Sequence, residues 1–242
     1  MRPGRLSRCA AAATALAGLW TAPAFALTEE QLRAAVPDAV PQEARFQAWT
    51  GVADRTLVAW TDYTDPAPAG AGKDDDILDL TVLVVQTSTG QVLQRFHADR
   101  IYDSRIHHVE FSKFEFDTAN YALAPGRRAF GVRLVGQHLG CGAEERDVLH
   151  LLEPDGAALR EVLALETLDH LAYCDCGEGH DVVRTIALAA TRTQGHADLV
   201  VRERREDTPD DMQHRTNCHP RITHSQRTTT LRFDGLRYPG VR

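Results

Sequence analysis

The sequence contains only two lysines, Lys73 and Lys113, so arginine supplies nearly all of its positive charge. Basic side chains number 27 in total, against 34 acidic ones. Binding a phosphate backbone requires clustered Lys and Arg. The composition therefore argues against nucleic acid as a partner.

Sequence motifs of several enzyme classes are also missing. The chain contains no Gly-x-Ser-x-Gly, no His-Glu-x-x-His, no P-loop and no dinucleotide-binding glycine pattern. A catalytic triad can still occur on any fold, because it is defined by geometry rather than by chain order. We therefore expect a non-catalytic protein and keep a hydrolase of unknown class as an alternative.

The N-terminal apolar run is too short for a membrane helix, which needs about 20 residues. It covers residues 9–20, follows a segment with three arginines, and precedes the small residues of Ala24-Phe25-Ala26. This order is typical of a Sec-type signal peptide. We expect residues 1–26 to be cleaved, leaving a single β-rich domain at 27–242 that is periplasmic or secreted and has no membrane span.

Helical periodicity is confined to the start of this domain. Thr28 to Gln31 has the form of a capping box, and the apolar residues that follow predict one short helix. From Arg45 onward apolar and polar residues alternate, with turn residues between the runs. We expect strands at 46–49, 57–60, 77–86, 92–96, 109–116, 121–123, 129–135, 148–152, 159–165, 182–190, 199–201 and 228–233.

This pattern predicts an all-β fold, an antiparallel sandwich or barrel-like meander of roughly ten strands with one short N-terminal helix. Glycines that recur about 40 residues apart, such as Gly156 and Gly195, leave a small propeller-like fold as an alternative. One strand needs an irregularity, because Val109 and Phe111 have the opposite parity to Phe114. A bulge at residues 112–113 would return all three to one face.

Four cysteines remain after cleavage of the leader: Cys141, Cys174, Cys176 and Cys218. An even number of cysteines in an exported chain predicts disulfides. A bond between Cys174 and Cys176 would close a very small, strained ring. We expect each of these two to pair instead with Cys141 or Cys218, without fixing the connectivity.

The same region suggests a metal site as an alternative. His170, Cys174, Cys176 and His180 offer two imidazoles and two thiolates, which zinc or copper accepts as ligands. Their spacing matches no standard zinc pattern, and thiols in an oxidising compartment tend to form disulfides. We expect no cofactor, and keep zinc or copper as the alternative.

Three polar segments could provide a binding surface, because binding residues are often on loops held by a rigid scaffold. They are residues 65–76, 174–180 and 202–220, all of which we expect to be loops. The combined hypothesis is an exported, disulfide-linked β-scaffold that presents these loops to an envelope protein or a small ligand.

One short resemblance points to the same location. The stretch from Tyr121 to Arg133, together with the Thr-Leu-Arg-Phe-Asp-Gly sequence ending at Gly235, resembles exported bacterial proteins of uncharacterised function. It covers about a tenth of the chain. The resemblance implies a periplasmic location and a β-rich fold, and no particular chemistry.

Overall fold

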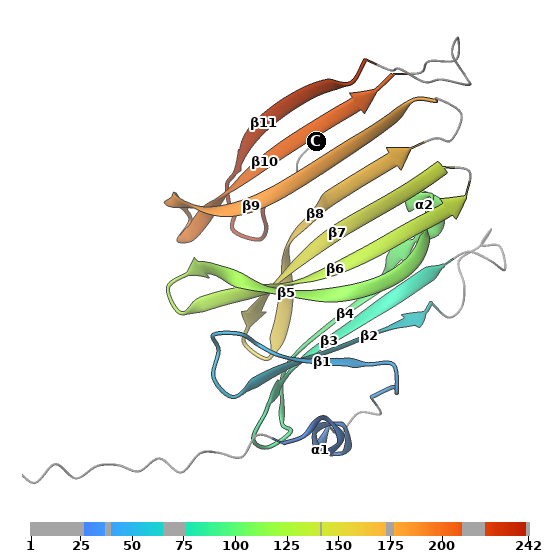
Figure 1. Cartoon of the computed structure of the whole chain (residues 1–242). Helices are drawn as coiled ribbons and strands as arrows, with labels where there is room; N and C mark the ends of the chain where they lie inside the picture. The colour runs from blue at the N-terminus through green and yellow to red at the C-terminus, as the bar shows by residue number, and fades with distance from the viewer. Residues whose placement is uncertain are drawn as a thin grey trace, which may run out of the picture.

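The computed structural model describes residues 27–36, 40–64, 76–140, 142–172, 177–209 and 221–240 (Figure 1). The elements, in chain order, are α1 (Glu29–Ala35), β1 (Arg45–Ala48), β2 (Arg55–Tyr63), β3 (Ile77–Gln86), β4 (Val92–Asp103), α2 (Ser104–His107), β5 (Glu110–Ala124), β6 (Arg127–Gly140), β7 (Gly142–Asp155), β8 (Ala158–Ala172), β9 (Gly179–Thr193), β10 (His196–Thr208) and β11 (Thr223–Leu231). None of these helices is long and apolar enough to cross a membrane.

All eleven of these strands belong to one hydrogen-bonded sheet. Eight of them follow the order β1-β2-β3-β4-β8-β7-β6-β5 and curl into a nearly closed barrel, and β9, β10 and β11 extend the sheet from β8 (Figure 1). The predicted all-β class and barrel-like alternative are confirmed. The propeller-like alternative is wrong, because a propeller consists of separate four-stranded blades.

Every neighbouring pair in the barrel is antiparallel except one. β4 and β8 pair in parallel through a single bridge, Arg95 with Ala158. From this bridge the two strands separate, and the far end of β8 pairs with β9 instead, through residues 168–171. The sheet therefore branches at β8.

The barrel interior is apolar. Strand β3 is buried on both of its faces. Leu80, Val82 and Val84 pack in the barrel interior. Leu83 and Val85, on the other face, pack against α1. A strand buried on both faces has a nearly continuous hydrophobic sequence, as residues 77–86 do. The interior cluster consists of Trp49, Leu57, Ala59, Leu78, Leu80, Val82, Val84, Tyr102, Val109, Phe114, Phe130, Val132, Leu134, Leu152 and Leu159.

A second core joins the outer face of the barrel to β9, β10, β11 and the C-terminal segment. Its buried members are Tyr121, Leu123, Ala129, Leu151, Val162, Leu163, Leu165, Leu199, Val201, Leu231, Phe233 and Tyr238. The Tyr238 hydroxyl donates to the carbonyl of Ala197 at 2.7 Å. The Tyr238 N–H donates to the carbonyl of Val162 in β8 at 2.7 Å, so the C-terminal segment holds β10 against β8.

A polar cluster lies beside this core. The Glu153 carboxylate has no exposed surface and accepts hydrogen bonds from Arg160 at 3.0 Å and from His196 Nε2 at 3.0 Å. The His196 ring stacks on Phe233 at 3.9 Å between centroids. Glu153 thus links the β7–β8 hairpin to the start of β10 and to the C-terminal segment.

Local predictions succeed where turn residues or strand parity determine the structure. The capping box at Thr28 and Gln31 is present, and the hairpin turns at 51–54, 88–90 and 153–156 join paired strands. The register of β5 against β6 shifts between Phe111 and Lys113. The predicted bulge is therefore confirmed.

The prediction of a loop at 202–220 is wrong for its first part, because β10 continues to Thr208. Its charged residues form ion pairs with neighbouring strands, as in the 2.7 Å bond from Arg184 Nε to Glu203. Such cross-strand pairs stabilise a sheet without apolar residues. Residues 210–220 lie outside the described part of the chain.

Candidate functional site

The two ends of the eight-strand path face each other across an opening, which we call the seam. Within the described chain, β1 pairs only with β2, and β5 pairs only with β6. Both are therefore edge strands, and each presents unpaired backbone N–H and C=O groups along one side. An open edge of this kind is a site where another strand can bind.

Side chains contact each other across the seam near both ends, and a pocket hollows the end near Arg45, which we call the wide end. The Thr118 hydroxyl lies 3.2 Å from the Thr50 hydroxyl, just beyond the end of β1. At the other end the Arg45 guanidinium lies over the Phe114 ring, 5.3 Å from its centroid. These contacts match residues 45–50 with residues 114–118 in the same direction, so β1 and β5 run parallel.

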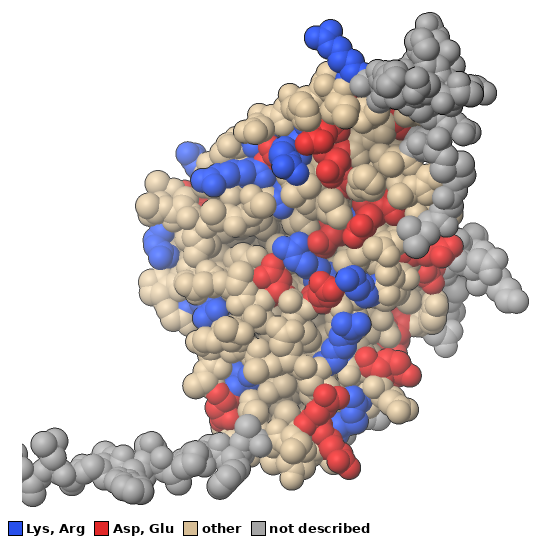
Figure 2. Space-filling view, in the orientation of Figure 1, with Lys and Arg blue, Asp and Glu red and all other residues tan. Residues whose placement is uncertain are grey.

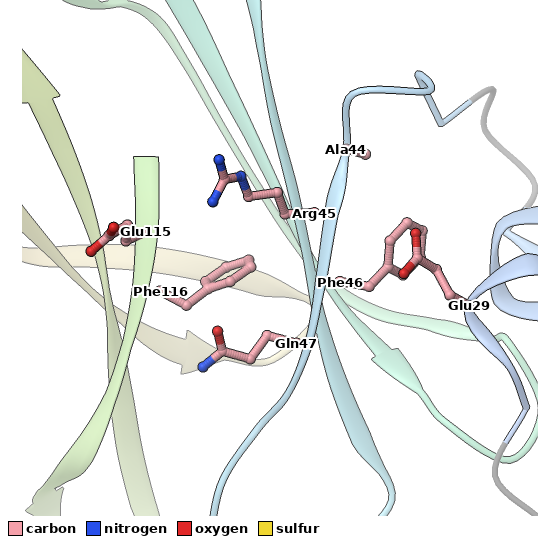
Figure 3. Close-up of a pocket in the computed structure, with 7 residues that line it drawn as sticks. All are labelled: Glu29, Ala44, Arg45, Phe46, Gln47, Glu115 and Phe116. Atoms are coloured by element: carbon pink, nitrogen blue, oxygen red, sulfur yellow. The ribbon is translucent and has the colours of Figure 1, made fainter. Parts of the chain in front are cut away.

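A pocket of about 620 Å³ occupies the wide end (Figure 3). Its lining residues come from α1, β1 and β5, and are Glu29, Ala44, Arg45, Phe46, Gln47, Glu115 and Phe116. Figure 3 shows Arg45 and Gln47 extending from β1 toward β5, whereas Phe46 extends toward α1. The pocket wall on the β1 side is therefore polar, and Phe116 supplies an apolar surface on the β5 side.

The hydrogen bonds of β1 determine which of its backbone groups face the seam. The Trp49 N–H donates to Arg55 of β2 at 3.0 Å. Because alternate residues of an antiparallel strand point their backbone groups in opposite directions, Gln47 and Arg45 also bond to β2. The N–H and C=O groups of Phe46 and Ala48 therefore point into the seam.

Charges of both signs lie along the exposed rim of the seam. Lys113 Nζ donates to Glu115 at 2.6 Å. This bond lowers the pKa of the Glu115 carboxyl below its usual value, and the positive charge of Arg45 lowers it further. Glu115 is therefore ionised at neutral pH. The rim can bind polar groups of either charge.

The histidines of the predicted metal site lie on neighbouring strands. His170 is opposite Asp181 in the β8–β9 ladder, and His180 is opposite Leu171. Successive ladder pairs place their side chains on opposite faces of a sheet, so the two imidazoles leave opposite faces. His180 Nε2 lies 3.1 Å from Asp169.

The predicted cysteine ligands and disulfides lie outside the described residues, as do Cys141, Cys174, Cys176 and Cys218 themselves. The disulfide-linked scaffold and the zinc or copper site therefore both stay predictions. Of the predicted binding loops, residues 65–75, 174–176 and 210–220 also lie outside the described residues. The prediction of a loop at 174–180 is wrong for its last two residues, because β9 begins at Gly179.

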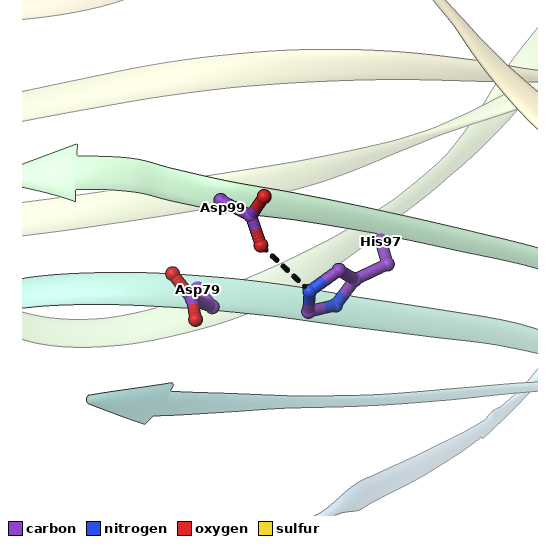
Figure 4. Close-up of side chains that lie close together, drawn as sticks. All are labelled: Asp79, His97 and Asp99. Carbon is purple, nitrogen blue, oxygen red and sulfur yellow. Dashed lines mark hydrogen bonds and ion pairs between the residues drawn. The ribbon is translucent and has the colours of Figure 1, made fainter. Parts of the chain in front are cut away.

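A different group of possible metal ligands lies on the outer face of β3 and β4. The ligand atoms of Asp79, His97 and Asp99 all lie within 4.8 Å of one another (Figure 4). Protein groups already satisfy these atoms. Asp79 Oδ1 accepts from the Thr64 hydroxyl and the Arg100 N–H, and the two His97 nitrogens bond to Thr81 and Asp99. Hydrogen bonds within the protein therefore hold these three side chains together.

Comparison with known proteins provides no identification. Neither a family profile, nor a curated protein, nor a solved structure gives a significant match to the chain. The resemblance to exported bacterial proteins thus stays a prediction. No sequence signal indicated the seam, because it depends on the relative placement of two strands about 70 residues apart.

Proposed function

We propose that this chain is an exported, non-catalytic binding protein that accepts an extended segment of an envelope protein between β1 and β5. The observation that carries the proposal is the parallel orientation of two facing edge strands. A single inserted strand could run antiparallel to both of them. Antiparallel pairing is slightly more stable per residue than parallel pairing, so the orientation favours a guest strand from another molecule.

The backbone supplies the affinity in this arrangement. Phe46 and Ala48 together offer two N–H and two C=O groups on the β1 side, and the longer β5 offers its own outer edge. Side chains of the guest strand would alternate between the apolar barrel interior and the charged rim. We therefore expect a preference for alternating apolar and polar residues.

Two further features support a protein partner. Acidic and basic side chains are interspersed on the face shown in Figure 2, whereas binding a phosphate backbone requires clustered positive charge. Arg45, which lies in the wide part of the seam, is an exposed side chain and can rotate away when a strand enters. Export is a prediction from the N-terminal sequence, and an intact mass spectrum of the mature protein tests it.

Peptide selection tests the proposal. A display library of randomised nine-residue peptides is screened against the full mature chain, and the peptides selected are measured by calorimetry. We expect binding to slow hydrogen exchange at the amides of Phe46 and Ala48. Replacing Ala48 with Pro removes an N–H that points into the seam, at an edge position where proline is tolerated.

Ala48→Pro should weaken peptide binding about tenfold, since a hydrogen bond contributes roughly 1 kcal/mol and its neighbour is disturbed as well. Ala48→Ser keeps the N–H and should bind like the wild type. A library without binders, unchanged exchange at Phe46 and Ala48, or equal affinity of the Pro and Ser variants would each contradict the proposal.

The two alternatives from the sequence require separate tests. Elemental analysis of protein purified from its own compartment would reveal bound zinc or copper. Screening with esters, peptides and glycans would reveal a hydrolase.

A further inference from the structure

Three turns meet at one end of the barrel and form a groove of about 450 Å³. They are the β1–β2, β5–β6 and β7–β8 connections, and Gln94 of β4 completes the wall. Protein sites for small ligands commonly have volumes of about 300–1,000 Å³. The groove thus has room for a small molecule.

Within the described part of the chain, the charged residues that line this groove are all arginines: Arg55, Arg127 and Arg128. The rest of the lining is mainly apolar or small, and includes Trp49, Val52, Ala122, Ala124 and Pro154. Trp49 is 5% exposed, and its ring contacts Phe130 of the barrel interior at 4.9 Å between centroids. An apolar floor beneath positive side chains complements a ligand with one apolar part and one anionic group.

Arg128 lacks a counterion. No carboxylate of the described chain lies within 4.0 Å of its guanidinium, whose Nη2 donates only to the Thr118 carbonyl at 3.3 Å. Its Nε is buried without a hydrogen-bond partner. The guanidinium lies directly over Gly51, where a Cβ atom would overlap it. A half-buried, uncompensated cation favours binding of an anion.

The other two arginines are only loosely paired. Arg127 Nη1 lies 3.6 Å from Glu153, a carboxylate that Arg160 and His196 already hydrogen-bond, and the Arg127 side chain is 46% exposed. Arg55 Nη1 lies 3.9 Å from Asp54. Asp54 itself accepts hydrogen bonds from Gln86 and Ser88. Arg55 can therefore contribute positive charge to a ligand in the groove, whereas the Arg127 side chain leaves β6 on the opposite face from Arg128 and lies at the margin of the groove.

We propose that this groove binds an amphipathic carboxylate with a short acyl chain. The carboxylate ion-pairs with Arg128, and the acyl chain lies over Trp49, Val52 and Ala124. Arginine and carboxylate form strong, often bidentate hydrogen bonds. This site does not depend on the strand-binding seam, which lies along β1 and β5.

Calorimetry of the full mature chain tests the proposal, with octanoate below its micelle concentration as the probe. We expect octanoate to bind at least tenfold more tightly than 1-octanol, which has the same chain without the charge. Acetate, which has the charge without the chain, should give no measurable binding. Equal affinity for octanoate and octanol, or no binding of octanoate at millimolar concentration, would overturn the proposal.

Substitutions locate the binding. Arg128→Gln should weaken octanoate binding about tenfold or more, and Arg221→Gln, at an exposed arginine outside the groove, should not change it. If Arg128→Gln lowers the unfolding temperature, Arg55→Gln provides a second test at another arginine of the groove. Wild-type affinity in both groove variants would overturn the proposal. Ala48→Pro should leave octanoate binding intact, which separates this site from the seam.

Discussion

Replacing Glu153 with Ala should destabilise the fold more than any substitution of an exposed acidic residue. Its carboxylate has no exposed surface and accepts hydrogen bonds from Arg160 and His196. Alanine would leave both donors without an acceptor, because the site is covered by Phe233 stacked on the His196 ring. The interaction between the barrel and β10 depends on this cluster.

The expected loss of unfolding free energy depends on how exposed the partners of Glu153 are. Removing one partner of a buried ion pair costs about 3–5 kcal/mol, and each buried donor left unpaired costs about 1–3 kcal/mol. Arg160 is 24% exposed and Arg127 is 46% exposed, so water can partly replace the lost carboxylate for these two. The His196 side chain is only 9% exposed and has no such compensation. We therefore expect a loss near the lower limit, about 3 kcal/mol.

Urea unfolding followed by tryptophan fluorescence measures this loss, and Glu43→Ala provides the exposed control. The control should change the unfolding free energy by less than about 0.5 kcal/mol. Combining Glu153→Ala with His196→Ala should show a coupling energy of about 1–3 kcal/mol, because the two side chains are in contact. If Glu153→Ala costs no more than Glu43→Ala, the buried carboxylate does not hold β10 against the barrel.

Two further substitutions have defined outcomes. Gly136→Ala places a Cβ atom on the buried Tyr102 hydroxyl, so it should cost about 2–3 kcal/mol in urea unfolding, whereas Gly240→Ala, which meets nothing, should cost almost none. A hydrogen bond from Gln86 lowers the pKa of the Asp54 carboxyl below 3.8. The ionised carboxylate therefore stabilises the fold above pH 3.8. This contribution is lost as the pH falls through the pKa that Asp54 has in the folded state. The stability difference between wild type and Asp54→Asn should therefore shrink between pH 6 and pH 3, and an unchanged difference would contradict the assignment.

The sequence was sufficient to predict structure that depends on near neighbours. The strand at 77–86 is continuous in apolar residues because both of its faces are buried, and its predicted bounds match β3. The bulge after Phe111 followed from parity alone, because only an extra residue returns Phe114 to the face of Val109. In each case the information lies within a few residues of the feature.

The prediction of a loop was wrong for a charged segment in which ion pairs, rather than apolar contacts, stabilise the strand. Residues 202–208 contain few apolar side chains, which suggested a loop, yet they continue β10 because β9 supplies partners such as Arg184 for Glu203. A sequence pattern does not show which strand will lie alongside. The candidate site is subject to the same limit, since Arg45 and Phe114 are far apart in the chain and meet only across the seam.

The parallel orientation of β1 and β5 follows from the one parallel joint in the barrel. If all eight strands alternated in direction, β1 and β5 would face each other antiparallel and could pair directly to close the barrel. Because β4 and β8 are parallel at the bridge between Arg95 and Ala158, β1 and β5 run in the same direction. A strand inserted between them restores antiparallel pairing on both sides. The joint between β4 and β8 therefore gives the two edges the orientation that the proposed guest strand requires.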